Sequence, residues 1–239
     1  MKHILIFLFC STFIYSTVAA QNLNAFTQET HSFFQTYVKN GLVDYQAVKN
    51  NMEEIASLYQ NIGNMKLEGV QDNEKKAFYI NAYNLIVIHQ IAKNYPVKSP
   101  MDIDGFFDKQ KHKTAHEMLT LNALEKQKLL QPYQDARIHF VLVCAAQSCP
   151  PLASFAFSAD QLEQQMKQMT EKALNNDEFI RVKASEDKVA VSKIFEWYQQ
   201  DFLRSAESTL AYINQYRKEK IPEGYSLGYY EYDWTLNDN

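Results

Sequence analysis

KKAFYINAYNLIVIHQIAKNY, from Lys75 to Tyr95, is the stretch that decides the fold. It is apolar on almost every side of a helical wheel, which predicts a helix buried in the core rather than one at the surface. The run Asp72-Asn73-Glu74 stands just before it and suits the positive end of a helix. Pro96 follows directly and disfavours helical geometry in the residue before it. The sequence therefore predicts a core helix that begins near residue 72 and ends before Pro96.

Two asparagines, Asn81 and Asn84, lie three residues apart in this helix and therefore on one face. A buried amide without hydrogen-bond partners costs roughly 1–3 kcal/mol. The two side chains therefore either pin neighbouring loops or line a pocket. Pinning is favoured, because most buried side-chain amides serve backbone groups.

Outward from the core helix, helical patterns dominate the N-terminal half, and strands alternate with helices after it. Helices are expected over 24–38, 45–62, 158–174 and 210–218, with shorter ones starting at Thr120 and Ser192. Strands are expected over 137–144 and in the tail YSLGYYEYDW, with a hairpin over 179–183 and 189–191. This order predicts a helix-rich α+β fold with a small, mainly antiparallel sheet. The length from residue 21 to 239 fits a single globular domain.

The first twenty residues have the three parts of a secretory signal peptide. Lys2 and His3 form a basic start, an apolar run follows from Ile4 to Tyr15, and small residues lead to Ala20. The apolar run is shorter than the roughly 20 residues that span a bilayer. We therefore expect a signal peptide over 1–20, an exported mature protein in the periplasm or outside the cell, and no transmembrane segment after removal of the signal.

Composition narrows the classes of partner. The net charge is −4 and no Lys/Arg patch stands out, which argues against nucleic acid as a partner. The acidic residues of the loop 97–114 do not have the spacing of the calcium ligands in an EF-hand. The CxxxxC spacing of Cys144 and Cys149 is not a standard metal pattern. The sequence therefore predicts no metal and no cofactor, and it leaves an unidentified small molecule or peptide as the ligand.

The densest chemistry lies in RIHFVLVCAAQSCPPL, which places His139, Cys144 and Cys149 within eleven residues. In a regular strand over 137–144, His139 and Cys144 point to opposite faces. Cys149 lies beyond a turn, so a His–thiol pair is easier to form with Cys149. This pattern supports a thiol-dependent hydrolase or acyl transferase acting on peptide-like or amide substrates, with Cys149 or Cys144 as nucleophile and His139 as general base.

A catalytic imidazole also needs an orienting partner. The candidates are Asn81, Asn84, Glu125 and Asp201, and spacing does not choose among them. An acid near the negative C-terminal end of a helix, as Asp201 is expected to be, needs a partner of its own. Arg137 or a backbone amine is expected to fill that role.

Two other kinds of function remain open. An even cysteine count in an exported chain makes a Cys144–Cys149 disulfide the default. The same residues would then form a non-catalytic module that binds a small anionic or peptidic ligand through Arg137, Asn81 and Asn84. The other function that remains open is that of a structural or interaction protein, which would use exposed aromatic residues of the C-terminal segment.

Seven segments in order resemble the domain-of-unknown-function 547 family, most closely its exported members from Bacteroidetes-like bacteria. They are VDY (43–45), AFYINAYN (77–84), GFFDKQKH (105–112), TLNALE (120–125), RIHFVLVCAAQSCPPL (137–152), IFEWYQQDF (194–202) and YYEYDWTLN (229–237). No activity is generally established for this family. The resemblance implies that the asparagine helix, Arg137, His139 and the cysteine turn are signature positions.

The helix-then-strand order, with His139 on a strand, also looks loosely like papain- and transglutaminase-type hydrolases. In those enzymes a helix that carries the nucleophile packs on a sheet whose strand carries the histidine. The corresponding helix here offers Asn81 instead of cysteine. This likeness is one of fold and says little about function.

Overall fold

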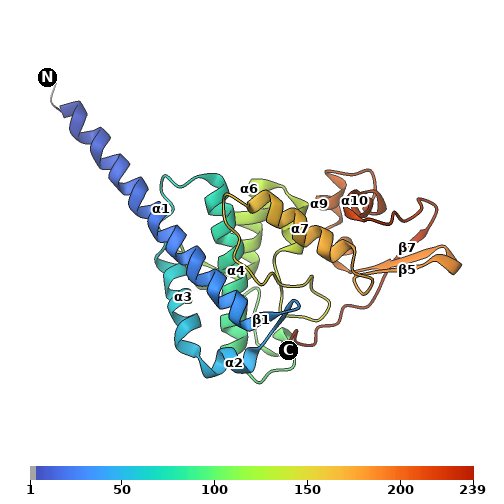
Figure 1. The fold of residues 1–239 in the computed structure, drawn as a ribbon. Helices are drawn as coiled ribbons and strands as arrows, with labels where there is room; N and C mark the ends of the chain where they lie inside the picture. The colour runs from blue at the N-terminus through green and yellow to red at the C-terminus, as the bar shows by residue number, and fades with distance from the viewer. Residues whose placement is uncertain (1–3) are drawn as a thin grey trace.

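The computed structural model describes residues 4–239, with side chains from Gln21 onward. The expected signal peptide, 1–20, lies outside the residues whose side chains are described. The backbone from residue 4 belongs to helix α1 (Ile4–Tyr37), whose first part extends away from the rest of the fold (Figure 1). Within the part of the chain that is described, no helix is both long and apolar enough to cross a membrane.

The core helix predicted from the sequence is α4 (Asp72–Asn94), and nearly all of its side chains from Lys76 to Ala92 are buried. Its start is fixed by a capping box in which Gln71 and Glu74 satisfy each other's backbone N–H groups. It ends two residues before Pro96, as expected.

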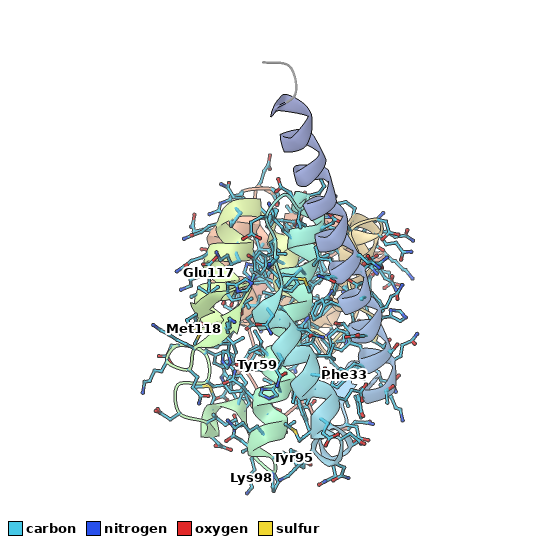
Figure 2. The ribbon with its side chains drawn as sticks, turned by 90° about the vertical axis from the view of Figure 1, so that its left-hand side faces the viewer. Phe33, Tyr59, Tyr95, Lys98, Glu117 and Met118 are labelled. Carbon is cyan, nitrogen blue, oxygen red and sulfur yellow. A yellow bond between two sulfur atoms is a disulfide. The ribbon has the colours of Figure 1, made fainter. Side chains whose placement is uncertain are left out.

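Helices α1, α2 (Tyr45–Asn50) and α3 (Met52–Asn64) pack around α4. Phe33 from α1 is fully buried, and the ring of Tyr59 from α3 stacks on that of His89 from α4 at a centroid distance of 4.2 Å (Figure 2). The predicted helix over 45–62 is therefore two helices, which are separated at Asn51.

The other helices are short apart from α7, and they follow the expected order. They are η1 (Pro100–Asp102), α5 (Leu121–Ala123), the π-helix η2 (Leu124–Leu130), α6 (Gln131–Tyr133), η3 (Ala136–Phe140), α7 (Leu162–Leu174), η4 (Ala184–Glu186), α8 (Ile194–Trp197), α9 (Gln199–Leu203) and α10 (Thr209–Tyr216). Helix α7 begins four residues later than the sequence predicts.

Three small sheets complete the fold of residues 4–239, so the predicted helix-rich α+β class is confirmed. Two antiparallel pairs join β1 (Val38–Lys39) to β2 (Leu42–Val43) and β3 (His112–Thr114) to β4 (Glu117–Leu119). The third sheet has the order β5 (Ile180–Lys183), β6 (Lys188–Val191) and β7 (Ser226–Tyr229). Its first pair is the expected antiparallel hairpin, whereas β7 joins β6 in parallel.

The predicted strand over 137–144 is wrong. Residues 136–140 form the 3-10 helix η3, which Asp135 caps by accepting a hydrogen bond from the backbone N–H of Arg137. The chain then runs irregularly to Cys144. Ile138, Phe140 and Val143 are buried all the same. The apolar run thus reflects burial on all sides and not strand pairing, and the parity argument for His139 and Cys144 does not apply.

From Gln21 onward, where side chains are described, the buried apolar side chains form two clusters. One surrounds α4 and includes residues of α1, α2 and α3. The other is built on Phe140, Phe195, Phe202 and Tyr212 in the C-terminal half. Cys149 packs against both clusters. The turn that carries the cysteines therefore lies at the junction of the two halves.

Candidate functional site

A pocket of about 320 Å³ opens at this junction. Its lining joins Tyr83 from α4 with residues of η2, the cysteine turn, α8 and the C-terminal tail. Six aromatic side chains contribute, namely Tyr83, Phe107, Trp197, Tyr198, Tyr232 and Trp234. A concave, mainly aromatic site with a few polar groups is typical of small-molecule binding.

Three of these aromatic residues form a continuous wall. The ring centroids of Tyr232 and Trp234 lie 4.7 Å apart, and those of Trp197 and Tyr232 lie 4.9 Å apart. Trp197, at the end of α8, is 48% exposed and marks the rim. The wall thus combines one short helix with a tail segment that lies more than thirty residues further along the chain.

Glu125 brings a buried carboxyl group to the pocket. It lies in the π-helix η2, which continues α5, and Thr120 caps α5 by accepting a hydrogen bond from the Ala123 N–H. Burial raises the pKa of Glu125, while the charge of His139 and the hydroxyl of Tyr198 oppose this rise. Glu125 therefore lies in a site where a proton or a cation is stabilised.

His139 lies beside Glu125 in the pocket lining and is held from behind by Asp201. Its Nε2 lies 2.9 Å from Oδ2 of Asp201, and its ring packs on Tyr198 at a centroid distance of 4.1 Å. Asp201 also pairs with Arg204 at 3.0 Å. The hydrogen bond from His139 lowers the pKa of Asp201. The predicted partner of Asp201 was Arg137 or a backbone amine, and the structure places His139 and Arg204 there instead.

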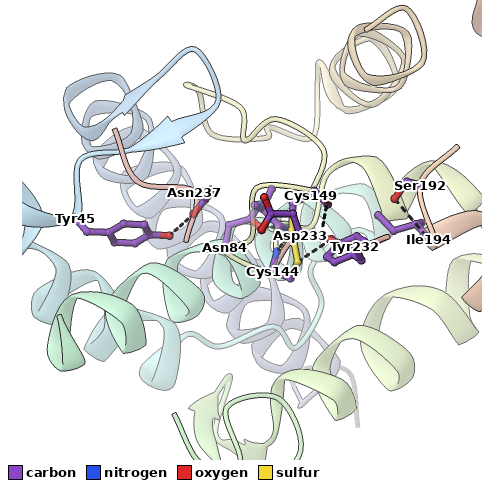
Figure 3. The surroundings of a disulfide bond; sticks show 11 residues. Tyr45, Asn84, Cys144, Cys149, Ser192, Ile194, Tyr232, Asp233 and Asn237 are labelled. Atoms are coloured by element: carbon purple, nitrogen blue, oxygen red, sulfur yellow. Dashed lines mark hydrogen bonds between the residues drawn. A yellow bond between two sulfur atoms is a disulfide. The ribbon is translucent and has the colours of Figure 1, made fainter. Parts of the chain in front are cut away.

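The two cysteines form a disulfide, which was the default prediction from their even number. Both cysteines line the pocket, and the hydroxyl of Tyr232 lies 3.2 Å from Sγ of Cys144 and 3.3 Å from Sγ of Cys149 (Figure 3). The backbone N–H of Cys144 donates to Sγ of Cys149 at 3.0 Å. The disulfide is therefore part of the pocket wall.

The two asparagines pin loops, which was the favoured prediction. The amide of Asn81 donates to the carbonyl of Phe157 at 2.8 Å and accepts from the same residue's N–H at 2.9 Å. Asn84 donates to the Val141 carbonyl at 2.8 Å and accepts from the Val143 N–H at 3.0 Å. Neither side chain lines the pocket.

Arg137 also lies away from the pocket lining. Its guanidinium pairs with Asp135 at 2.8 Å and with Glu163 at 2.9 Å. Lys76 reaches the same Asp135 carboxylate at 2.7 Å. These groups form an ion-pair network that ties α4, η3 and α7 together. Of the predicted site residues, the structure thus brings Glu125, His139 and both cysteines into the pocket, with Asp201 directly behind His139.

Sequence reasoning missed the aromatic wall. Trp197 was given no role in a site from the sequence, and Tyr232 and Trp234 were expected only in a tail strand. One signal pointed to them, namely the high aromatic density of YYEYDW. Asn122 and Phe107, which also line the pocket, had no signal of their own.

Fold and site together define a helix-rich α+β domain with an aromatic pocket whose wall includes a disulfide. Residues 67–173 match the family described as Protein of unknown function, DUF547, which is the family that the motifs of the sequence resemble. The matched part contains Glu125, His139 and both cysteines, whereas the aromatic wall lies beyond it. No curated protein and no solved structure matches the chain significantly.

Proposed function

We propose that this domain binds a small molecule that has an aromatic or aliphatic body and a basic nitrogen. The observation that carries the proposal is the buried carboxyl group of Glu125 in a pocket lined by six aromatic residues and by no Lys or Arg. A buried carboxylate without a cation is costly, because burial removes the water that stabilises its charge.

The groups around Glu125 support this ligand chemistry. Asp201 lies on the far side of His139, where its carboxylate contacts the imidazole at 2.9 Å and pairs with Arg204 at 3.0 Å. An ammonium group that enters the pocket would pair with Glu125 directly. The faces of tyrosine and tryptophan rings also attract cations, with typical contributions of about 0.5–2 kcal/mol. The aromatic wall would hold the body of the ligand.

Binding is favoured over thiol-dependent hydrolysis because of the disulfide. A cysteine nucleophile requires a free thiolate, and both sulfurs are bonded to each other. The proposal therefore assigns Cys144 and Cys149 to the pocket wall in the oxidised protein. It also places the protein in an oxidising compartment outside the cytoplasm, where such a bond persists.

Isothermal titration calorimetry with tryptamine and its matched acid, indole-3-propionate, tests the proposal. Tryptamine is expected to bind at least about tenfold more tightly, which corresponds to about 1.4 kcal/mol. Replacement Glu125→Gln should remove this preference, whereas the exposed control Glu53→Gln should keep it. The proposal would be overturned if the amine and the acid bound equally well, or if the dissociation constant of tryptamine were above about 1 mM. It would also be overturned if Glu125→Gln kept the preference for the amine.

A further inference from the structure

The disulfide lies in an unusual place for a purely structural bond, because both of its cysteines line a pocket of about 320 Å³ and both sulfurs contact Tyr232 in the same lining. We propose that the Cys144–Cys149 disulfide undergoes exchange with small thiols. In this reaction Sγ of Cys144 is the atom attacked, and Cys149 is the leaving thiolate. The inference goes beyond ligand binding and does not depend on the basic nitrogen proposed above.

The bond contributes little to holding its own turn. The cysteines are only five residues apart, and closing so short a loop gives less stabilisation than closing a long one. The turn is fixed by the backbone instead. Gln147 N–H donates to the Thr235 carbonyl at 2.8 Å, and Cys149 N–H donates to the Ala146 carbonyl at 3.1 Å. The two sulfurs therefore stay close together after the bond opens, which favours reversible exchange.

The two sulfurs have different surroundings. Sγ of Cys149 accepts a hydrogen bond from the Cys144 backbone N–H and lies within reach of the Tyr232 hydroxyl, whereas Sγ of Cys144 has only the hydroxyl. A disulfide sulfur carries no hydrogen, so Tyr232 is the donor, and its single O–H is shared between the two sulfurs. Burial raises the pKa of Tyr232, which keeps this donor protonated.

Hydrogen bonds to a thiolate stabilise its charged form and lower its pKa. A thiol of lower pKa is also the better leaving group in exchange. Because Cys149 has one more donor than Cys144, cleavage that releases the Cys149 thiolate is favoured. This asymmetry directs the incoming thiolate to Cys144.

The reaction balances with two small thiols. A thiolate attacks Sγ of Cys144, so a new S–S bond forms to that sulfur, the Cys144–Cys149 bond breaks, and its electron pair leaves on Cys149. A second thiolate then attacks the small-molecule sulfur of this mixed disulfide and releases the oxidised small disulfide and the Cys144 thiolate. The protein gains two electrons, which the two thiols supply, and each thiolate that leaves takes up a proton according to its pKa.

The first test compares the oxidised protein with the oxidised peptide VCAAQSCP, which has the sequence of residues 143–150 without the pocket. Both are treated with excess 2-mercaptoethanol at pH 7, samples are quenched with an alkylating agent, and opening is followed by mass spectrometry. The protein disulfide is expected to open about tenfold faster than that of the peptide, because its leaving group is stabilised. Opening slower than in the peptide would make the bond structural and would overturn the inference.

Two further measurements test the direction of attack. Peptide mapping should find the mixed disulfide on Cys144 and the alkyl group on Cys149, and the reverse pattern would refute the assignment. Tyr232→Phe should slow opening several-fold. The matched control Tyr229→Phe, on β7, should not, because Tyr229 has no hydrogen bond to either sulfur among the described residues. A thermal melt of each variant shows that it is folded.

Discussion

Replacement of Asn84 by alanine tests whether the core helix organises the cysteine segment. The amide of Asn84 makes two buried hydrogen bonds, at 2.8 Å and 3.0 Å, to the backbone of Val141 and Val143. Removal of the amide leaves one buried carbonyl and one buried N–H without partners, and each such group costs about 1–3 kcal/mol. We therefore expect Asn84→Ala to lower the free energy of unfolding by about 2–6 kcal/mol.

Urea unfolding, followed by far-UV circular dichroism, measures this loss. The matched control is Asn61→Ala, because Asn61 also lies inside a helix, α3, and its amide makes only an exposed hydrogen bond to Glu29. Both replacements gain the same helix propensity, so their difference isolates the buried contacts. If the two variants differ by less than about 0.5 kcal/mol, the loop does not depend on Asn84 and the reasoning is refuted.

Two carboxyl groups give opposite predictions about pH. Burial alone would raise the pKa of Asp135, but hydrogen bonds from Arg137 and Lys76 hold it at about 2, below its ordinary value of 3.8. Asp135 therefore stabilises the fold by about 2 kcal/mol above pH 4, and this stabilisation is lost as the pH falls towards 2. In urea unfolding, Asp135→Asn should have a lower free energy of unfolding than the parent protein at pH 7 and nearly the same value near pH 2. Burial raises the pKa of Glu125, so its charge destabilises the fold progressively as the pH rises above 4.5. Glu125→Gln should thus have a higher free energy of unfolding than the parent protein at pH 7 and a similar one at pH 4. A lower free energy of unfolding at pH 7 would contradict the view that Glu125 destabilises the fold and is kept for binding.

The core helix could be predicted because local signals agree on it. An apolar surface on every side, acids at the start and Pro96 after the end all indicate one element, and α4 (Asp72–Asn94) has these bounds. The pinning role of Asn81 and Asn84 followed from the same reasoning, since an amide buried in a helix must bond to backbone from elsewhere. What the sequence did not reveal is which loops they pin.

The wrong strand over 137–144 has a physical cause. An apolar run of this length is compatible with a buried strand and with any other fully buried segment, and periodicity does not separate them. The deciding contact is remote, because the backbone of Val141 and Val143 is satisfied by the Asn84 side chain and not by a neighbouring strand. No local pattern contains that information.

The polar residues of the pocket were found because their types are chemically distinctive, whereas its aromatic residues were not. His139, Cys144 and Cys149 stand together in the sequence, and Glu125 lies in a recognisable helix start. Aromatic side chains, in contrast, usually belong to a core. Their gathering around one pocket depends on the return of the C-terminal tail to the cysteine turn, and this is a property of the tertiary fold.

The return of the C-terminal tail to the cysteine turn also explains why the pocket lies at the junction of the two halves. Residue 236 of the tail forms a β-bridge with Ala146 beside the cysteine turn. Two residues further, Asp238 forms a bridge with Val43, and the hydroxyl of Tyr45 donates to the Asn237 side chain at 2.8 Å (Figure 3). The segment that carries Tyr232 is therefore held at both core clusters. The tail thus connects the cysteine turn to the N-terminal helices by backbone hydrogen bonds, in which the Gln147 N–H donates to the Thr235 carbonyl at 2.8 Å and the Val43 N–H donates to the Asn237 carbonyl at 3.0 Å.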